Sequence, residues 1–130
     1  MRASILGIGT VFVSLIAATA LADDPAGNAE QGQTAFHQQC SVCHSLTANR
    51  VGPILSGVYG RKAGSVPEYG YSNAVKSSNV VWDRTTLDKW LTSSQNFLPG
   101  QRMNISISDA QKRADIIAYL KSISGPGGDK

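Results

Sequence analysis

The sequence feature that most constrains this chain is the five-residue cluster Cys40-Ser41-Val42-Cys43-His44, which holds both cysteines of the sequence. The chain before it is typical of an amphipathic helix that continues into the cluster. On a helix, positions i, i+3 and i+4 share one face. Both sulfurs and the imidazole of His44 are therefore predicted to point to the same side, toward a common target.

This spacing is the attachment signature for c-type haem. Thioether bonds from Cys40 and Cys43 can hold the two vinyl carbons of a porphyrin, while His44 reaches the iron from the same side. We therefore predict one covalently attached haem c as the cofactor, with His44 as an axial iron ligand.

Three other interpretations of the cluster remain. Cys40 and Cys43 could form a structural or thioredoxin-like disulfide, although no strand is predicted before Cys40. They could bind zinc together with His37 and His44, but four ligands on one or two turns of a single helix cannot surround a metal tetrahedrally. The third interpretation is that the motif occurs by chance. His37 itself is expected to be a solvated helix residue.

A second axial ligand is predicted at Met103. The only other methionine is Met1, which we expect to be removed with a leader. Met103 follows Pro99-Gly100, a turn signal, so its sulfur is presented from an irregular loop. A loop methionine is usually core filler. Methionine and histidine together are, however, the usual axial pair in electron-carrying cytochromes.

Residues 1–22 resemble a secretion signal. Arg2 supplies a positive start, an apolar run follows, and Ala20-Leu21-Ala22 fits the cleavage rule, which predicts cleavage before Asp23. An uncleaved anchor is the alternative, but the run is shorter than the roughly 20 residues of a spanning helix. Because covalent haem attachment takes place outside the bacterial cytoplasm, we expect a periplasmic protein.

Removing residues 1–22 leaves 108 residues, 23–130, which is the size of one small domain. This part has 11 Lys and Arg against 9 Asp and Glu, a net charge of +2, and no basic run. That balance does not suggest a nucleic-acid partner. The glycine-rich end, residues 125–130, is expected to be frayed.

The remaining pattern predicts an all-α fold with three main helices and long loops. The first helix is capped by Asn28. The second runs from about Thr85 to Ser94, with Thr85 as its cap and Leu87, Trp90 and Leu91 facing inward. The last begins near Ser108, with Gln111 completing a capping box. Gly32, Phe36 and Tyr119 are expected where the two terminal helices cross.

A glycine-rich stretch separates His44 from Trp82, and so long a span with little regular structure normally counts against a compact domain. A large flat ligand removes the conflict, because the loops can wrap a haem that supplies the apolar centre. This is a reason to expect the cofactor that does not depend on the cysteine motif.

At this point the chain resembles class I cytochromes c of the mitochondrial type, as found in bacteria, over nearly all of residues 27–122. The resemblance is carried by short motifs spread along the sequence. They are Gly32 and Phe36, Cys40-Ser41-Val42-Cys43-His44, Gly52-Pro53-Ile54-Leu55, Gly60-Arg61-Lys62-Ala63-Gly64, Tyr69-Gly70-Tyr71-Ser72, Trp82, Leu87, Trp90-Leu91, Pro99-Gly100-Gln101-Arg102-Met103 and Arg113-Ala114-Asp115-Ile116-Ile117-Ala118-Tyr119-Leu120.

The resemblance implies roles for further residues of a haem pocket. The carbonyl of Pro53 would accept a hydrogen bond from His44 and fix its tautomer. Trp90 stands where a tyrosine usually bonds the methionine sulfur. The haem propionates would be surrounded by four side chains, Arg61, Tyr69, Tyr71 and Trp82. Lys62, by contrast, is expected in an ordinary solvated turn.

The function that this predicts is a soluble, monomeric one-electron carrier rather than an enzyme. Its partners would be membrane redox complexes, such as a cytochrome bc-type reductase and a terminal oxidase or another acceptor. The first alternative is a haem enzyme or gas sensor that uses a sixth iron site vacated by Met103. A binding module held by a Cys40–Cys43 disulfide is the second. Neutral Gln39, Gln95 and Asn96 replace lysines that ring the exposed haem edge in relatives, which predicts weak electrostatic steering.

Overall fold

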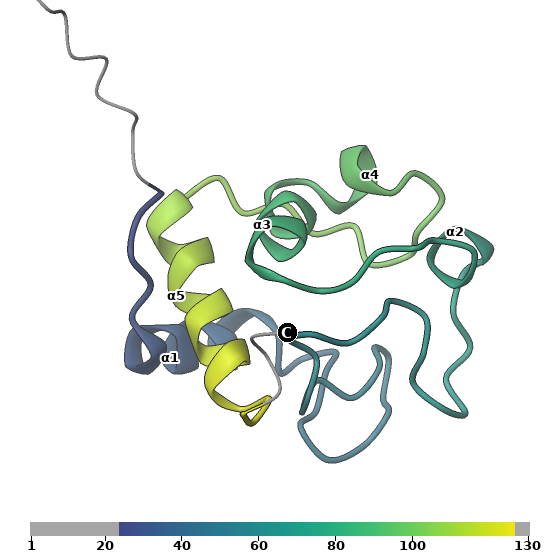
Figure 1. The fold of residues 1–130 in the computed structure, drawn as a ribbon, viewed down its shortest axis with the longest axis horizontal. Coiled ribbons are helices and arrows are strands. Elements are labelled where there is room, and N and C mark those ends of the chain that lie inside the picture. The colour runs from purple at the N-terminus through teal and green to yellow at the C-terminus, as the bar shows by residue number, and fades with distance from the viewer. Residues whose placement is uncertain (1–23, 127–130) are drawn as a thin grey trace, which may run out of the picture.

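The computed structural model describes residues 24–126, and over this range the predicted all-α fold is confirmed (Figure 1). The helices are α1 (Ala29–Gln39), α2 (Asn73–Lys76), α3 (Arg84–Thr92), α4 (Ser94–Phe97) and α5 (Ala110–Ser122). In this part of the chain the only β pairing is an isolated bridge between Lys62 and Val81. The predicted leader and residues 127–130 of the tail lie outside the described residues.

Helices α1 and α5 pack against each other at one side of the molecule, as predicted (Figure 1). The backbones approach so closely that a Cβ built on Gly32 would lie 1.8 Å from the carbonyl oxygen of Asp115. Gly27, whose role was not predicted, makes a similar approach, with a Cβ 2.1 Å from the carbonyl oxygen of Ala114. Beside the contact, the rings of Phe36 and Tyr119 are 5.3 Å apart.

Helix α1 begins as predicted but ends earlier. The side chain of Asn28 accepts hydrogen bonds from the N–H groups of Glu30 and Gln31. The helix ends at Gln39, and Cys40 is its C-terminal cap. The expectation that the whole cysteine cluster lies on the helix is therefore wrong. Residues 41–43 form a turn that extends the helix only locally, through a hydrogen bond from His44 N–H to Cys40 O at 2.8 Å.

The predicted caps of the other two main helices are wrong by one or two residues. Asp83, not Thr85, caps α3, and it forms a capping box with Thr86. Asp109, not Ser108, caps α5 by accepting from the N–H of Lys112. Gln111 therefore completes no capping box and instead donates to Ala26 O and Asp115 Oδ1. Ser, Thr and Asp are all good caps, so neighbouring candidates leave the choice to tertiary packing.

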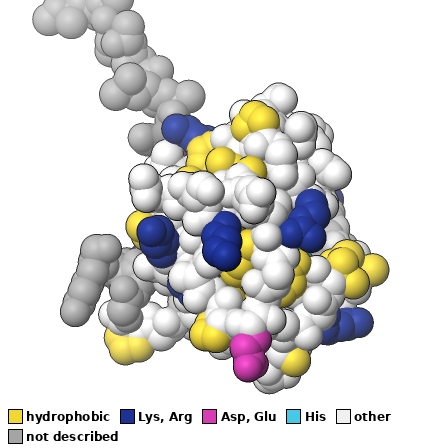
Figure 2. All heavy atoms as spheres, turned by 90° about the vertical axis from the view of Figure 1, so that its right-hand side faces the viewer, with side chains coloured by type: hydrophobic (Ala, Val, Ile, Leu, Met, Phe, Trp, Pro, Cys, Tyr) yellow, Lys and Arg dark blue, Asp and Glu magenta, His cyan; other side chains and the backbone are white. Residues whose placement is uncertain are grey.

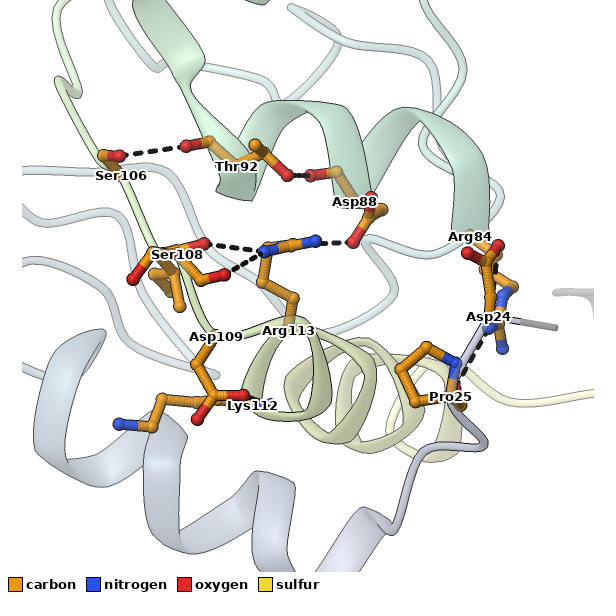
Figure 3. A network of polar contacts seen from close by, with 11 residues as sticks. Asp24, Pro25, Arg84, Asp88, Thr92, Ser106, Ser108, Asp109, Lys112 and Arg113 are labelled. Carbon is orange, nitrogen blue, oxygen red and sulfur yellow. Dashed lines mark hydrogen bonds and ion pairs between the residues drawn. The ribbon is translucent and has the colours of Figure 1, made fainter. Parts of the chain in front are cut away.

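The segment after α4 is tied back to α3 by Arg113 of α5 (Figure 3). The guanidinium of Arg113 pairs with Asp88 at 2.7 Å and donates to the carbonyls of Ile107 and Ser108. Ser106 Oγ adds a hydrogen bond to the carbonyl of Thr92, at the end of α3. This network fixes where the loop that carries Met103 rejoins the helical frame.

The core lies between α1, α3 and α5 and extends into the long segment between His44 and Trp82. As predicted, Leu87, Trp90 and Leu91 of α3 are buried. The short helices α2 and α4 were not predicted. Among residues 24–126, no helix is both long and apolar enough to cross a membrane.

The close helix contact predicts that Gly32→Ala destabilises the protein strongly. The added methyl group collides with the Asp115 carbonyl, which is backbone and cannot rotate away. We expect a loss of about 3 kcal/mol or more in the free energy of unfolding, measured by guanidinium titration. The control is Gln33→Ala on the exposed face of α1, where a change below about 0.5 kcal/mol is expected. Equal effects of the two substitutions would contradict the contact.

Candidate functional site

A cavity of about 410 Å³ lies among α3, α5 and the long loops. A volume of this size falls within the range of pockets that hold small molecules and cofactors. Its walls are mainly apolar and include Val58, Val75, Leu87, Ile116 and Leu120. The structure brings all ten residues of the sequence-predicted site to this one cavity, namely Cys40, Cys43, His44, Pro53, Arg61, Tyr69, Tyr71, Trp82, Trp90 and Met103.

The two cysteines line the cavity where α1 ends. Both thiols are free, with Cys40 buried and Cys43 exposed. Burial raises the pKa of the Cys40 thiol to about 11. Redox-active cysteines of the thioredoxin kind have instead a lowered thiol pKa, and Cys40 follows a helix rather than a strand. Both observations weigh against a thioredoxin-like disulfide.

The zinc interpretation gains no support from the geometry. His37 lies exposed on α1, with its Nδ1 3.3 Å from the hydroxyl of Ser41. Within residues 24–126, no group of three or more His, Cys, Asp or Glu side chains is arranged to hold a metal ion. A site with fewer protein ligands, completed by a porphyrin, fits the arrangement better.

His44 is buried and held in one orientation. Its Nδ1 lies 2.8 Å from the carbonyl oxygen of Pro53. Because a carbonyl can only accept, Nδ1 carries the proton and Nε2 keeps its lone pair for a metal. Burial lowers the pKa of His44, against the opposing effect of the Pro53 hydrogen bond. The ring is therefore neutral at neutral pH, as a metal ligand must be.

The backbone at Gly52 presses against the same ring, a contact that the sequence did not reveal. A Cβ at this position would lie 2.2 Å from His44 Cε1. The N–H of Gly52 also donates to Cys43 O at 2.8 Å, which joins the loop to the cysteine cluster. Glycine is needed here so that the Pro53 carbonyl can reach the imidazole.

Met103 lies at the cavity from the loop between α4 and α5. Its side chain is partly exposed, and its sulfur accepts a hydrogen bond from the indole N–H of Trp90 at 3.2 Å. The Trp90 ring packs edge-on against Trp82, with centroids 5.2 Å apart. Trp90 thus orients the thioether from α3, the role that a tyrosine usually has in relatives.

The four residues assigned to the propionates gather at one part of the cavity wall. Arg61 donates to the carbonyls of Ile54 at 2.7 Å and Ser56 at 3.0 Å. The hydroxyl of Tyr69 donates to Val51 O at 2.6 Å. Arg61 and Tyr69 therefore hold the loop around the cavity in addition to lining it.

Two donors of this group are available to a ligand. The hydroxyl of Tyr71 accepts from the N–H of Val66, so its own O–H can donate elsewhere. The buried indole of Trp82 has no hydrogen-bond partner among the described residues. Burial lowers the pKa of Arg61 and raises that of Tyr71. Arginine keeps its charge in proteins, so this wall offers one cation and two neutral donors to an anion.

These observations fit haem c. Two thiols three residues apart, a neutral imidazole with a free Nε2 and a thioether meet at a mainly apolar cavity, and hydrogen-bond donors for carboxylates line its wall. The fold and the site therefore define a small helical protein that holds a covalent haem.

Comparison with known proteins identifies the family. A family model described as cytochrome c matches residues 29–124. A cytochrome c of Euglena viridis is 43% identical over 100 residues, covering 75% of this chain and 98% of that protein. Cytochrome c2 of Blastochloris viridis is 34% identical over 124 residues, covering 92% and 97%. The solved structure of cytochrome cH from Methylobacterium extorquens matches with a TM-score of 0.71 and 44% identity, covering 74% of this chain and 99% of that one.

The chain belongs to the cytochrome c family and has the class I fold. Members of this family are electron carriers with covalent haem c, and Cys40 and Cys43 stand at its attachment spacing.

The contacts of Arg61 predict that Arg61→Ala destabilises the protein while Lys62→Ala does not. Removing the guanidinium leaves the Ile54 and Ser56 carbonyls without their donor, at a cost of about 2 kcal/mol. Lys62 is exposed, and a change within about 0.5 kcal/mol is expected there. Guanidinium unfolding of the haem-loaded variants measures both. Similar losses for the two would mean that Arg61 is only a surface residue.

Proposed function

We propose that this protein is a periplasmic one-electron carrier whose iron is bound by His44 and Met103. The observation that carries the proposal is the pair of prepared ligands at one cavity. His44 is locked by Pro53 and Met103 is oriented by Trp90. When bound, haem c supplies an iron that takes up or releases one electron.

The residues of the cavity suit electron transfer better than catalysis. With His44 and Met103 both bound to the iron, neither ligand position is left for a substrate. No Asp or Glu lines the cavity described here, and His44 is its only histidine. Acid–base catalysis needs a positioned proton donor or acceptor, and His44 is already committed to Pro53. The apolar walls exclude water, which keeps solvent reorganisation small when the charge changes.

Arg61, Tyr71 and Trp82 support the proposed position of the propionates. Burying a carboxylate without partners is costly. The Arg61 charge and the free donors of Tyr71 and Trp82 lie where they can offset that cost. Tyr69 contributes through its ring, which packs against Tyr71 with centroids 4.7 Å apart.

The periplasmic location is supported by the leader pattern and by one relative. The alignment with cytochrome c2 of Blastochloris viridis covers 92% of this chain. Residues 24–130 are a smaller fraction of the chain than the alignment covers, so the alignment includes part of residues 1–23. We propose that residues 1–22 are cleaved and that residues 23–130 act as the mature domain.

The proposed partners are membrane redox complexes, a cytochrome bc-type reductase on one side and a terminal oxidase or other acceptor on the other. We propose that the carrier meets them as a monomer. Figure 2 shows Lys and Arg side chains spread singly over the face that carries α2, with neutral surface between them. Gln39, Gln95 and Asn96 are exposed and uncharged. Encounter with a partner would therefore depend little on long-range attraction.

One observation favours the alternative of a gas sensor or haem enzyme. The residue Met103 is 37% exposed and lies on a loop, so departure of its side chain would open an iron position. The same experiment separates the two functions, because a sensor binds external ligands readily and a carrier does not.

The test is the visible spectrum and the intact mass of protein purified from the periplasm. We expect a mass equal to residues 23–130 plus one haem, and the weak long-wavelength band of ferric iron bonded to a thioether. In Met103→Leu this band should disappear, the midpoint potential should fall because a thioether raises it, and imidazole should bind rapidly. Ile105→Leu, a similar change in the same loop, should keep the band. A colourless wild-type protein, or rapid imidazole binding by it, would contradict the proposal.

Weak electrostatic attraction between the protein and its partner predicts that the rate of electron exchange depends little on ionic strength. We expect a change of less than about threefold between low and physiological salt, whereas strongly steered encounters are accelerated by roughly ten- to a thousandfold. Stopped-flow mixing with a purified membrane reductase measures this rate. The double variant Gln39→Lys with Asn96→Lys should make the dependence steeper. A steep fall for the wild type would refute the expectation.

A further inference from the structure

Gln101, two residues before Met103, is a neutral polar side chain that is almost fully buried. It is 5% exposed, although its neighbours Gly100, Arg102 and Asn104 are exposed. No role of its own is predicted for this residue from the sequence. A buried amide is costly unless its hydrogen bonds are made, so its partners show what it does.

Every hydrogen-bonding position of the Gln101 amide is used, within the loop and with Gln95 of α4. Its Oε1 accepts from the backbone N–H of Met103 and from that of Asn104, the latter at 3.1 Å. Its Nε2 donates to Gln95 Oε1 at 3.0 Å and to Asn104 Oδ1 at 3.1 Å. Since a backbone N–H needs an acceptor, the orientation of this amide is fixed by its partners.

These contacts shape the backbone on both sides of the sulfur. Asn104 has φ 51° and Gly100 has φ 90°, so the chain turns through two left-handed residues around Met103. Such a conformation costs energy at a residue other than glycine. Gln101 offsets this cost by accepting a hydrogen bond from the N–H of Asn104 and by donating one to the side-chain oxygen of Asn104.

The loop is also anchored to α4 at two points. Gln95 binds Gln101 on one side of Met103. On the other side, the fully buried Ser94 exchanges hydrogen bonds with the backbone of Ile105, through its own N–H and through its hydroxyl. Met103 therefore sits between two anchors, and Gln101 is the side chain that connects the first anchor to the Met103 backbone itself.

We infer that Gln101 is a positioning residue for Met103, and that its amide limits how often the thioether leaves the iron. The inference rests on the proposed ligation by His44 and Met103. Trp90 acts on the sulfur directly, whereas Gln101 acts on the backbone that carries the sulfur. Without the amide, the loop opens at lower free-energy cost and an external ligand reaches the iron more often.

The test is the rate of imidazole binding to the ferric, haem-loaded protein. In Gln101→Ala the rate should rise at least about tenfold, since two or more hydrogen bonds of ordinary strength are lost from the closed loop. Gln101→Glu retains an acceptor for the two N–H groups but loses the Nε2 donor. Its rate should fall between those of the wild type and Gln101→Ala.

Gln111→Ala is the matched control. Gln111 also makes two side-chain hydrogen bonds, to Ala26 O and Asp115 Oδ1, both at 2.8 Å and both remote from the Met103 loop. We expect it to lower thermal stability without changing the imidazole rate. A merely structural role of Gln101 would give the same result as this control.

Amide hydrogen exchange gives a second readout, which does not use ligand binding. The N–H groups of Met103 and Asn104 should exchange faster in Gln101→Ala than in the wild type. In Gln111→Ala they should exchange at the wild-type rate. An unchanged imidazole rate together with unchanged exchange at these amides would overturn the inference and leave the ligation intact. A wild-type protein that binds imidazole as fast as Met103→Leu would overturn the ligation, and the role of Gln101 with it.

Discussion

The backbone contact between α1 and α5 is the constraint on which the rest of the structure depends. At Gly32 in α1, and at Gly27 just before this helix, no side chain separates the chain from the backbone of α5, so the relative position of the two helices is set by the backbones themselves. Helix α1 delivers Cys40 to the cavity and α5 delivers Ile116 and Leu120. If α1 and α5 crossed at a greater distance, the part of the cavity wall at Cys40 would shift relative to the part formed by Ile116 and Leu120. The two glycines do not line the cavity, but they determine how the walls from α1 and α5 are placed.

Outside the helices, side chains supply the hydrogen-bond partners that the backbone finds within helices and sheets elsewhere. The segment between His44 and Trp82 has only one short helix, so its backbone groups need other partners. Asn49 binds the N–H of Ile54 and the carbonyl of Pro67, while Arg61 and Tyr69 bind further carbonyls. In the described residues, every side-chain nitrogen or oxygen that is itself closed off from solvent has a hydrogen-bond partner. The loops can therefore enclose the part of the apolar cavity that α3 and α5 do not line.

The sequence predicted what depends on side-chain identity and failed where tertiary contacts decide. The cysteine spacing, the lone Met103 and the inward face of Leu87, Trp90 and Leu91 follow from residue type and periodicity. The cap of α1 at Asn28 was also predicted, but the caps of α3 and α5 were not, because adjacent Asp, Ser and Thr residues are nearly equivalent locally and packing selects among them. The extension of α1 through His44 failed for a related reason. Once Cys40 is buried at the helix end, the chain turns so that Gly52 and Pro53 can reach His44.

Gln101 shows the kind of feature that sequence patterns do not reveal. Its role depends on a buried amide meeting two backbone N–H groups, and no periodicity marks such a contact. One signal was present, namely a polar residue two positions before Met103, the only methionine after Met1. The two proposed ligands are in fact secured by different means. His44 is held by a backbone carbonyl beside a helix end, and Met103 is held by the side chains of Trp90 and Gln101. A single substitution can remove a side-chain partner but not a carbonyl. It follows that the affinity of iron for its sixth ligand can change through mutation while the attachment side of the haem stays intact.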